Sequence, residues 1–434
     1  MKLFENYASG IERILSENYT SVDRSTIKSS KPSDILLKAM GKDTEMFKKS
    51  IELQGQIDGD KALLNIDREG LTKLFGSNAS GFEDIVIGSH PDFADLDYNG
   101  YLNHHCVSMF VDIKGSTRLA LKEDLKKVRL IKDSLLTLCI HVANFFGGHI
   151  HRLQGDAVFV QFVRKGAYKN DAIINSLNAA SVLCQFVEQD LKDVFEKKGL
   201  SPIKIRIGID YGNDEDVLWS HYGVPSCAEL TTTSLHTDLA AKLQSKAPSN
   251  GIVIGANIVK ELDLPEEFVK HVYKTVDDKQ VVETYVINGF NYKQYIFKWK
   301  TYLLSFDFIK KSSNGITLDI EEKDFRITCK VSDEGKDNWT PYYQNSYSIP
   351  KKMSIAFTIT FKGLPYYRQG NETIEWVIHN RGDEAQLEQK VEIRNINETE
   401  CVTNAAYLGH HYISCKIKRN FGSNITVTFP VYVQ

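Results

Sequence analysis

Between about residues 104 and 290, the spacing of apolar side chains switches repeatedly between that of strands and that of helices. Cys106–Ile113 is a short apolar run with the β-branched residues typical of a strand. In the next stretch apolar residues recur every three or four positions, which predicts one amphipathic helix. Its expected stripe consists of Leu121, Leu125, Val128, Ile131, Leu135, Leu138, Val142 and Phe145. Gly147-Gly148 is expected to end this helix.

The rest of this region continues the alternation. Two short β-type runs, 149–153 and 157–162, are joined by Gln154-Gly155-Asp156, which predicts a hairpin. A second amphipathic helix over about 173–194, a strand over 203–209, a third helix over about 234–246 and a strand over 251–255 follow. The order β-α-β-β-α-β is that of a ferredoxin-like split unit with additions.

The two ends of the chain have different patterns. After about residue 295, short β-type runs separated by polar turns predict an all-β sandwich. Residues 1 to about 75 are polar with a helical pattern, and about 76–103 are expected to form a linker or loosely packed segment. We therefore expect an α+β protein with a helical N-terminal segment and linker (1–103), a ferredoxin-like domain (104–294) and a C-terminal β-sandwich (295–434).

Composition narrows the class of protein. The chain has 42% hydrophobic and 25% charged residues, as soluble globular proteins do, and its net charge of −3 gives no reason to expect a nucleic-acid partner. It has neither a secretion signal nor an apolar run of the roughly 18 residues that a membrane span needs. Its seven cysteines are scattered without a C-x-x-C motif, which is typical of reduced thiols. A cytoplasmic protein without membrane contact is expected.

The candidate chemistry begins where the first strand ends. Phe110-Val111-Asp112-Ile113 leads directly into a turn, Lys114-Gly115-Ser116-Thr117. Free backbone N–H groups of Gly115, Ser116 and Thr117 in such a turn can cradle a triphosphate. The carboxylate of Asp112 would then lie beside the phosphates.

A second carboxylate, Asp156, follows Asp112 by 44 positions at the tip of the predicted hairpin. In a split βαβ arrangement, the end of the first strand lies beside that hairpin. Two carboxylates flanking a triphosphate suit two Mg²⁺ or Mn²⁺ ions, of which one activates the ribose 3′-hydroxyl and the other neutralises the departing pyrophosphate. Either aspartate alone is as well explained by turn formation.

Together, F-x-D-I-x-G-S-T and G-D-A resemble the two metal motifs of the class III nucleotide cyclases, the adenylate and guanylate cyclase family, over about 104–290. The resemblance implies that the Ile113 carbonyl also binds a metal. It implies a head-to-tail homodimer in which one subunit supplies the metals and its partner supplies the base-binding and transition-state groups. The segment 236–244 is similar to the family's Asn-x-x-x-Arg helix, with Asp238 and Lys242 at those two positions. Lysine offers a point charge there instead of the bidentate fork of arginine.

The positions that select the base in that family hold Arg152 and Thr231. Arginine only donates hydrogen bonds, so it suits the acceptors of a pyrimidine. The whole layout resembles the pyrimidine cyclases of bacterial Pycsar antiphage defence that carry a C-terminal β-rich sensor domain. That resemblance implies conversion of CTP to 3′,5′-cyclic CMP and pyrophosphate, making a second messenger, with a phage-derived signal acting on the C-terminal domain.

Three other functions also fit the sequence. Thr231 both donates and accepts, so it does not separate cytosine from uracil, and a uridylate cyclase acting on UTP fits as well. An adenylate cyclase with a regulatory β domain is the third enzymatic choice. A catalytically inactive module that binds nucleotide and dimerises is the alternative from another class. A plain packing role is the alternative for the C-terminal domain.

Overall fold

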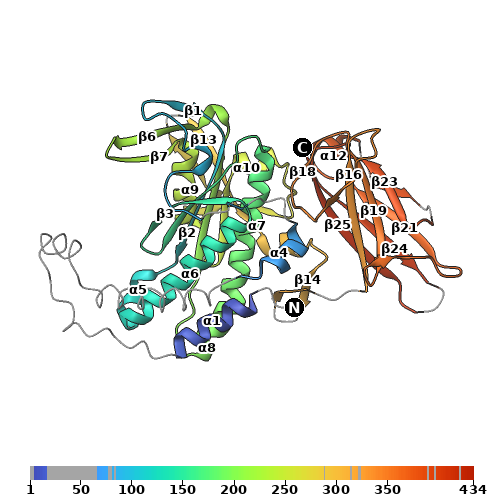
Figure 1. Ribbon diagram of the computed structural model, residues 1–434, viewed down its shortest axis with the longest axis horizontal. Coiled ribbons are helices and arrows are strands. Elements are labelled where there is room, and N and C mark those ends of the chain that lie inside the picture. Colours follow the sequence, from blue (N-terminus) through green and yellow to red (C-terminus); the bar gives the residue numbers. More distant parts are fainter. Residues whose placement is uncertain are drawn as a thin grey trace, which may run out of the picture.

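The computed structural model describes residues 4–16, 66–76, 81–82, 85–287, 289–312, 315–320, 324–388, 391–394, 397–419 and 422–434. Figure 1 shows a mixed body of helices and strands, and beside it a second body built almost entirely of strands. Most of the helical pattern expected before residue 66 lies outside the described residues. Among those described, no helix has the length and apolar character needed to cross a membrane.

The mixed body is organised around one large sheet with the strand order β12-β13-β8-β5-β2-β4-β3, in which β9 also pairs with β13. Its centre consists of β2 (Cys106–Ile113), β3 (Gly148–Gln154), β4 (Ala157–Phe162), β5 (Ile205–Gly212) and β8 (Gly251–Gly255). Neighbours along β5-β2-β4-β3 are antiparallel, and β5 pairs with β8 in parallel. With helices after β2 and β4, this is the ferredoxin-like arrangement that the apolar pattern predicts.

The helix after β2 differs from the prediction. It is two helices, α5 (Ser116–Lys122) and α6 (Leu125–Phe145), separated at Glu123-Asp124. Asp124 caps α6 by accepting a hydrogen bond from the Lys126 N–H at 2.8 Å. Leu121 and Leu125 are therefore not part of the buried stripe, and their exposed fractions are 83% and 73%.

Further helices cover the sheet. α7 (Lys169–Phe186) continues through a π-helical turn (Val187–Leu191) into α8 (Lys192–Lys197). Two N-terminal helices, α1 (Glu5–Ser16) and α4 (Arg68–Phe75), pack on the same core, which includes Tyr7, Leu71 and Phe75. The Tyr7 hydroxyl donates to the Ser134 carbonyl of α6 at 2.5 Å. The described N-terminal helices are thus integral to the mixed body.

Part of the segment expected to be a loose linker is packed on the mixed body. His90 and Phe93 in a short 3₁₀ turn (Pro91–Phe93) are completely buried, and the Phe93 ring stacks on Trp219 at 4.1 Å. β1 (Tyr101–Asn103) then joins β6 (Leu218–Val224) and β7 (Cys227–Thr233) in a three-stranded sheet. Aromatic burial holds this segment, despite its many turn residues.

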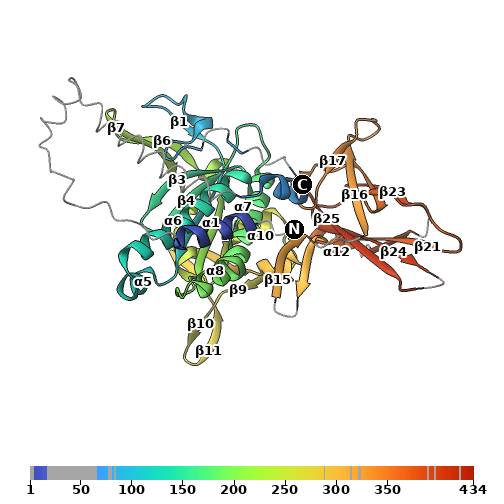
Figure 2. The same ribbon diagram turned by 60° about the horizontal axis from the view of Figure 1, so that its bottom comes forward.

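The remaining elements of the mixed body follow β7. They are α9 (Leu235–Lys246), α10 (Ala256–Glu261), β9 (Val269–His271), β10 (Tyr273–Val276), β11 (Lys279–Val282), β12 (Thr284–Ile287), β13 (Phe290–Phe297) and α11 (Trp299–Leu303). Figure 2 shows the β10–β11 hairpin projecting from the body. The predicted third helix and last strand correspond to α9 and β8.

The C-terminal body contains two five-stranded sheets that share one apolar core, which includes Phe357 and Trp376. One sheet has the order β17-β16-β19-β20, with β23 on β19, and the other has β18-β25-β24-β21-β22. Their bounds are β16 (Phe325–Ser332), β17 (Thr340–Tyr342), β18 (Ser348–Ile349), β19 (Ser354–Phe361), β20 (Leu364–Pro365), β21 (Thr373–His379), β22 (Val391–Arg394), β23 (Glu400–Asn404), β24 (Gly409–Lys418) and β25 (Ile425–Val433). A small hairpin of β14 (Ile309–Ser312) and β15 (Gly315–Ile320) precedes them, and α12 (Asp383–Glu388) is a short helix between strands. The strand pattern predicted after residue 295 is present, but the expected boundary is too early, because Phe297, Trp299 and Leu303 pack in the core of the mixed body.

Helix α7 contacts both bodies. Its Asp171 carboxylate accepts hydrogen bonds from the Ser348 N–H at 2.8 Å and the Ser348 hydroxyl at 2.6 Å. About two turns further on, Asn178 donates to the Asn345 carbonyl at 3.0 Å. The second body is therefore attached to α7 through buried polar contacts.

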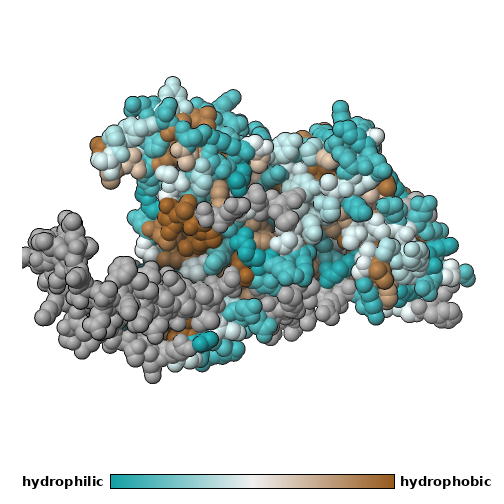
Figure 3. Space-filling view, viewed as in Figure 1, coloured by the Kyte–Doolittle hydropathy of each residue, from teal (hydrophilic) through white to brown (hydrophobic). Residues whose placement is uncertain are grey.

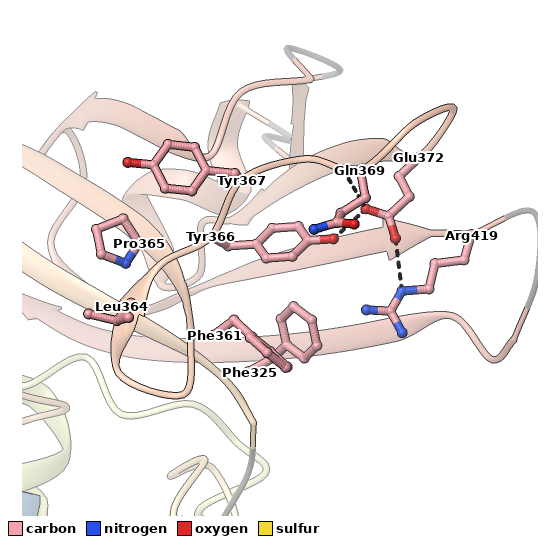
Figure 4. Close-up of a pocket in the computed structure, with 9 residues that line it drawn as sticks. All are labelled: Phe325, Phe361, Leu364, Pro365, Tyr366, Tyr367, Gln369, Glu372 and Arg419. Carbon is pink, nitrogen blue, oxygen red and sulfur yellow. Dashed lines mark hydrogen bonds and ion pairs between the residues drawn. The ribbon is translucent and has the colours of Figure 1, made fainter.

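An open cavity of about 530 Å³ lies on the C-terminal body (Figure 4). Its floor includes the packed rings of Phe325, Phe361 and Tyr366. At one end the Glu372 carboxylate accepts from the Tyr366 hydroxyl and pairs with Arg419 at 3.1 Å. The cavity thus combines aromatic walls with one ion pair of opposite charges.

Candidate active site

Strand pairing brings Asp112 and Asp156 together. β2 and β4 are antiparallel with Val111 opposite Val158, so the end of β2 lies beside the β3–β4 turn that carries Asp156. Partial burial raises the pKa of Asp112, and the nearby Asp156 carboxylate raises that pKa further, against the opposing effect of Arg206. The two carboxylates therefore share one site, as the spacing of the motifs predicts.

Three polar side chains hold these carboxylates in place. The sequence motifs do not indicate any of the three. Arg206 of β5 pairs with Asp112 at 2.6 Å, and Gln244 of α9 donates to the same Asp112 oxygen at 3.1 Å. Lys132 of α6 pairs with Asp156 at 3.2 Å. Arg206 stands directly opposite Asp112 in the β2–β5 register, which sequence spacing alone does not disclose.

The donor set fits a hard divalent cation. Asp156 Oδ2 is buried and has no hydrogen-bond partner within the described chain. An unpaired buried carboxylate oxygen is costly, and beside a second carboxylate it is a ready ligand for Mg²⁺ or Mn²⁺. Ile113, whose carbonyl is the third expected ligand, follows Asp112 at the end of β2 with its side chain buried.

Another group of potential ligands lies at the opposite end of β2. His104, His105 and Asp214 have their donor atoms close together. Asp214 Oδ1 accepts from the His105 N–H at 2.6 Å and lies 3.0 Å from His105 Nδ1. Because these contacts satisfy Asp214 within the fold, we interpret this cluster as structural.

The turn after Asp112 has the backbone conformation that a phosphate cradle needs. Gly115 adopts φ +77°, in the left-handed region, and is the N-cap of α5. The first N–H groups of a helix, here those of Ser116 and Thr117, lack partners within the helix. Gly115 and Thr117 are exposed and Ser116 is half-buried, so the turn is open to a ligand.

Asp238 and Lys242 are exposed and lie one turn apart on α9. The Lys242 ammonium donates to the Tyr285 hydroxyl at 2.5 Å and lies 4.5 Å from the centre of that ring. Within the described chain, Lys242 forms no ion pair with Asp112 or Asp156. The structure thus brings the two aspartates together but does not join Lys242 to them in a single subunit.

The two predicted base-selecting residues lie on neighbouring elements. Arg152 of β3 forms an ion pair with Glu229 of β7. Thr231 lies two positions beyond Glu229 on β7, so both side chains point to the same side of that strand. Glu229 is a site residue that the sequence motifs did not indicate.

The face around this site is partly apolar. Figure 3 shows a concentrated hydrophobic patch below the β6–β7 arm, over the region of β2 and β3. Tyr222 and Val224 are exposed on the arm, and Leu121 and Leu125 are exposed on α5 and α6. Large exposed apolar patches are characteristic of interaction surfaces.

Comparisons with known proteins agree with this architecture. Residues 304–428 match the model of the adenylyl/guanylyl and SMODS C-terminal sensor domain. The chain is 40% identical to a cytidylate cyclase of Staphylococcus aureus, over 80% of this chain and 82% of that protein. It is 34% identical to a cytidylate cyclase of Escherichia coli, over 63% of this chain and 60% of that one.

Similarity to solved structures is more distant. The adenylyl cyclase CyaB from P. aeruginosa aligns with 45% of this chain and 95% of its own, at 17% identity and a TM-score of 0.39, which is too low to bear on function. The relatives carry the assignment: this is a class III nucleotide cyclase with a C-terminal sensor domain. Within that class, the chain belongs to the family of the bacterial cytidylate cyclases.

Proposed function

We propose that this enzyme converts CTP to 3′,5′-cyclic CMP and pyrophosphate at the Asp112–Asp156 site. The observation that carries the proposal is the meeting of these two carboxylates in a chain 40% identical to a cytidylate cyclase. Asp112, Asp156 and the Ile113 carbonyl would hold two Mg²⁺ or Mn²⁺ ions. When bound, such ions lower the pKa of the ribose 3′-hydroxyl and neutralise the departing pyrophosphate.

The neighbouring side chains hold the two metal-binding aspartates in position. Arg206 and Gln244 both hold Asp112 Oδ2, which fixes the rotamer of Asp112 and leaves its other oxygen for a ligand. Lys132 neutralises Asp156 from one side. This arrangement keeps two like charges together at the end of β2.

The triphosphate is placed by backbone groups. The N–H groups of Gly115, Ser116 and Thr117 bind its oxygens, since a left-handed glycine before a helix turns these donors outward. Bound in this way, the α-phosphate lies between Asp112 and Asp156 and faces the ribose 3′-oxygen.

We assign the transition-state groups to the partner subunit. Lys242 contacts Tyr285 of its own chain and forms no ion pair with either metal-binding aspartate there. In the head-to-tail homodimer that the family resemblance implies, Lys242 of one subunit would lie at the phosphate bound by the other. The apolar face below the β6–β7 arm is the surface we propose for that contact. Lys242 then stabilises charge on the α-phosphate, and Asp238 orients the ribose.

Base selection rests on Arg152 and Thr231, also from the partner subunit. Arg152 supplies only hydrogen-bond donors, which match the acceptors O2 and N3 of cytosine. The resemblance to Pycsar defence supports a role in antiphage signalling. In this role cyclic CMP is the second messenger, and the sensor domain receives a phage-derived signal in the cytoplasm.

The decisive experiment is a product assay. Purified full-length protein is given ATP, GTP, CTP or UTP with Mn²⁺, and the products are identified by mass spectrometry. We expect cyclic CMP to dominate. Dominant cyclic UMP or cyclic AMP would replace the proposal with a uridylate or adenylate cyclase, and binding of nucleotide without any product would indicate an inactive module.

A further inference from the structure

Glu229 occupies a position next to the base-selecting arginine that no sequence motif marks. Its Oε2 accepts from the Arg152 guanidinium, and its Oε1 lies 3.3 Å from Nε2 of His151. The exposed fractions of the Arg152 and Glu229 side chains are 52% and 32%, so a ligand can reach both. An ion pair this exposed is worth little, and its members can turn toward a ligand at small cost.

The register of β7 fixes the direction of the Glu229 side chain. Leu230 is completely buried, whereas Glu229 and Thr231 on either side of it are half-buried. Alternation along a strand therefore places Glu229 and Thr231 on one side and Leu230 on the other. Arg152, Glu229 and Thr231 form a continuous polar row at the expected base-binding position.

One oxygen of Glu229 retains capacity to accept a hydrogen bond. His151 Nδ1 lies 3.1 Å from the Gly88 carbonyl, which can only accept, so Nδ1 carries the hydrogen. Burial lowers the pKa of His151, which disfavours a second hydrogen on the ring, and a carboxylate oxygen can accept more than one hydrogen bond. Oε1 of Glu229 is thus available to a donor from outside the chain.

The chemistry of this row separates cytosine from uracil. Cytosine presents two acceptors, O2 and N3, next to the donor N4–H₂, whereas uracil presents the acceptor O4 in place of that amino group. Arg152 can only donate and the ionised Glu229 can only accept. An arginine fork beside a carboxylate reproduces the donor–donor–acceptor edge with which guanine pairs with cytosine. The carboxylate, which can only accept, would repel the O4 acceptor of uracil.

We infer that Glu229 is the residue that selects cytosine, by accepting a hydrogen bond from the N4 amino group while Arg152 donates to N3 and O2. This inference rests on the proposed cyclase activity toward CTP and adds the group that distinguishes CTP from UTP. Glu229 does not touch the reacting phosphate, so its effect is on base selectivity.

The test compares CTP with two nucleotides changed at position 4 of the base, of which UTP also carries a hydrogen on N3. Values of kcat/KM are measured with CTP, UTP and the triphosphate of pyrimidin-2-one riboside, which is cytidine without the amino group. The wild-type enzyme should prefer CTP over the amino-less analogue by about tenfold or more, the usual discrimination of a good base contact. In Glu229→Ala this preference should fall to about twofold or less, and in Glu229→Gln, whose amide also donates, the ratio of UTP to CTP turnover should rise about tenfold.

The control is Glu215→Gln, which removes the same charge at an exposed position of the same body and should leave all three ratios unchanged. Thermal unfolding of each variant checks the fold, and Glu229→Gln is retained as the isosteric variant if Glu229→Ala is unstable. An equal loss of activity toward all three nucleotides would overturn the inference, since Glu229 would then only position Arg152. Absence of CTP turnover in the wild-type enzyme would instead reject the proposed function itself.

Discussion

Asp112 and Asp156 show what sequence spacing reveals about single residues and what it does not. Their convergence is predictable because a strand end and a hairpin tip meet in a ferredoxin-like unit. Arg206, Gln244 and Lys132 come from three other elements, and only the finished sheet and its helices bring them to the carboxylates. Glu229 likewise becomes visible only through its ion pair with Arg152.

Replacing either aspartate tests the metal assignment. Asp112→Ala and Asp156→Ala should each lower kcat at least about a hundredfold, because loss of one ligand removes charge stabilisation at the phosphate. Cyclic CMP formation at saturating Mn²⁺ is the measurement. Isothermal titration with Mn²⁺ alone should show weaker binding in both variants, and retention of full activity in either would contradict the assignment.

Lys242 is expected to act on the transition state. Lys242→Ala should reduce kcat by about a hundredfold with little change in KM, because the charge on phosphorus develops only during the reaction. Lys246→Ala is the matched control, since Lys246 lies one turn further on α9 and pairs with Glu283. A change confined to KM would remove Lys242 from the transition state.

At the scale of elements, the break between α5 and α6 shows the limit of apolar periodicity. Leu121 and Leu125 continue the spacing of the stripe, yet Asp124 ends that continuity because its side chain caps a new helix. The strands were predictable because alternating and buried apolar runs follow the sheet. The 3₁₀ turn containing Phe93 was missed because its burial depends on Trp219, far away in the sequence.

Removing the cap of α6 should weaken the fold. Asp124→Ala is expected to lower the free energy of unfolding by about 1 kcal/mol, the usual value of an N-cap side chain. Asp124→Ser keeps an oxygen acceptor and should stay near the wild-type value. Chemical denaturation followed by circular dichroism measures both, and equal stability of Asp124→Ala and wild type would show that the cap contributes nothing.

The stability that the start of α9 contributes to the fold should depend on pH. Burial opposes protonation of His236, but its hydrogen bond to the buried Asp210 carboxylate at 3.0 Å raises the pKa of His236 above the ordinary value of 6.5. This pair therefore contributes its full stability below about pH 6.5 and loses it as the pH rises through the raised pKa. Unfolding free energies should decline as the pH rises above 6.5 in the wild type and decline less in His236→Gln, and parallel curves would contradict the assignment.

At the scale of the whole molecule, the change of pattern near residue 295 predicted the second body, and its strands are present. Within the described chain, Lys242 bonds to Tyr285 and pairs with neither aspartate, which is the arrangement expected if the complete site needs two copies. The apolar face that would join those copies depends on side chains scattered over several elements. Sequence patterns did not indicate that face.

Mixing two inactive variants tests the dimer directly. Asp112→Ala and Lys242→Ala proteins, each inactive alone, should regain activity when mixed and allowed to exchange subunits, because one heterodimer site is then intact. About a quarter of wild-type activity is expected from random exchange, with half of the molecules being heterodimers that carry one working site of two. Continued inactivity of a mixture in which exchange is shown by mass photometry of tagged subunits would argue for sites completed within one chain.

Helix α7 joins the two bodies of the protein. It packs on the central sheet with Ile174 and Leu177 in the same core as Val111 of β2, while Asp171 and Asn178 bond to the C-terminal body. Burial raises the pKa of Asp171, so pulling the bodies apart would leave a desolvated acid and an amide without their partners. Separating the two bodies would therefore cost the desolvation of both polar groups, and the helix that carries these groups also packs in the core beneath the strand that ends in Asp112.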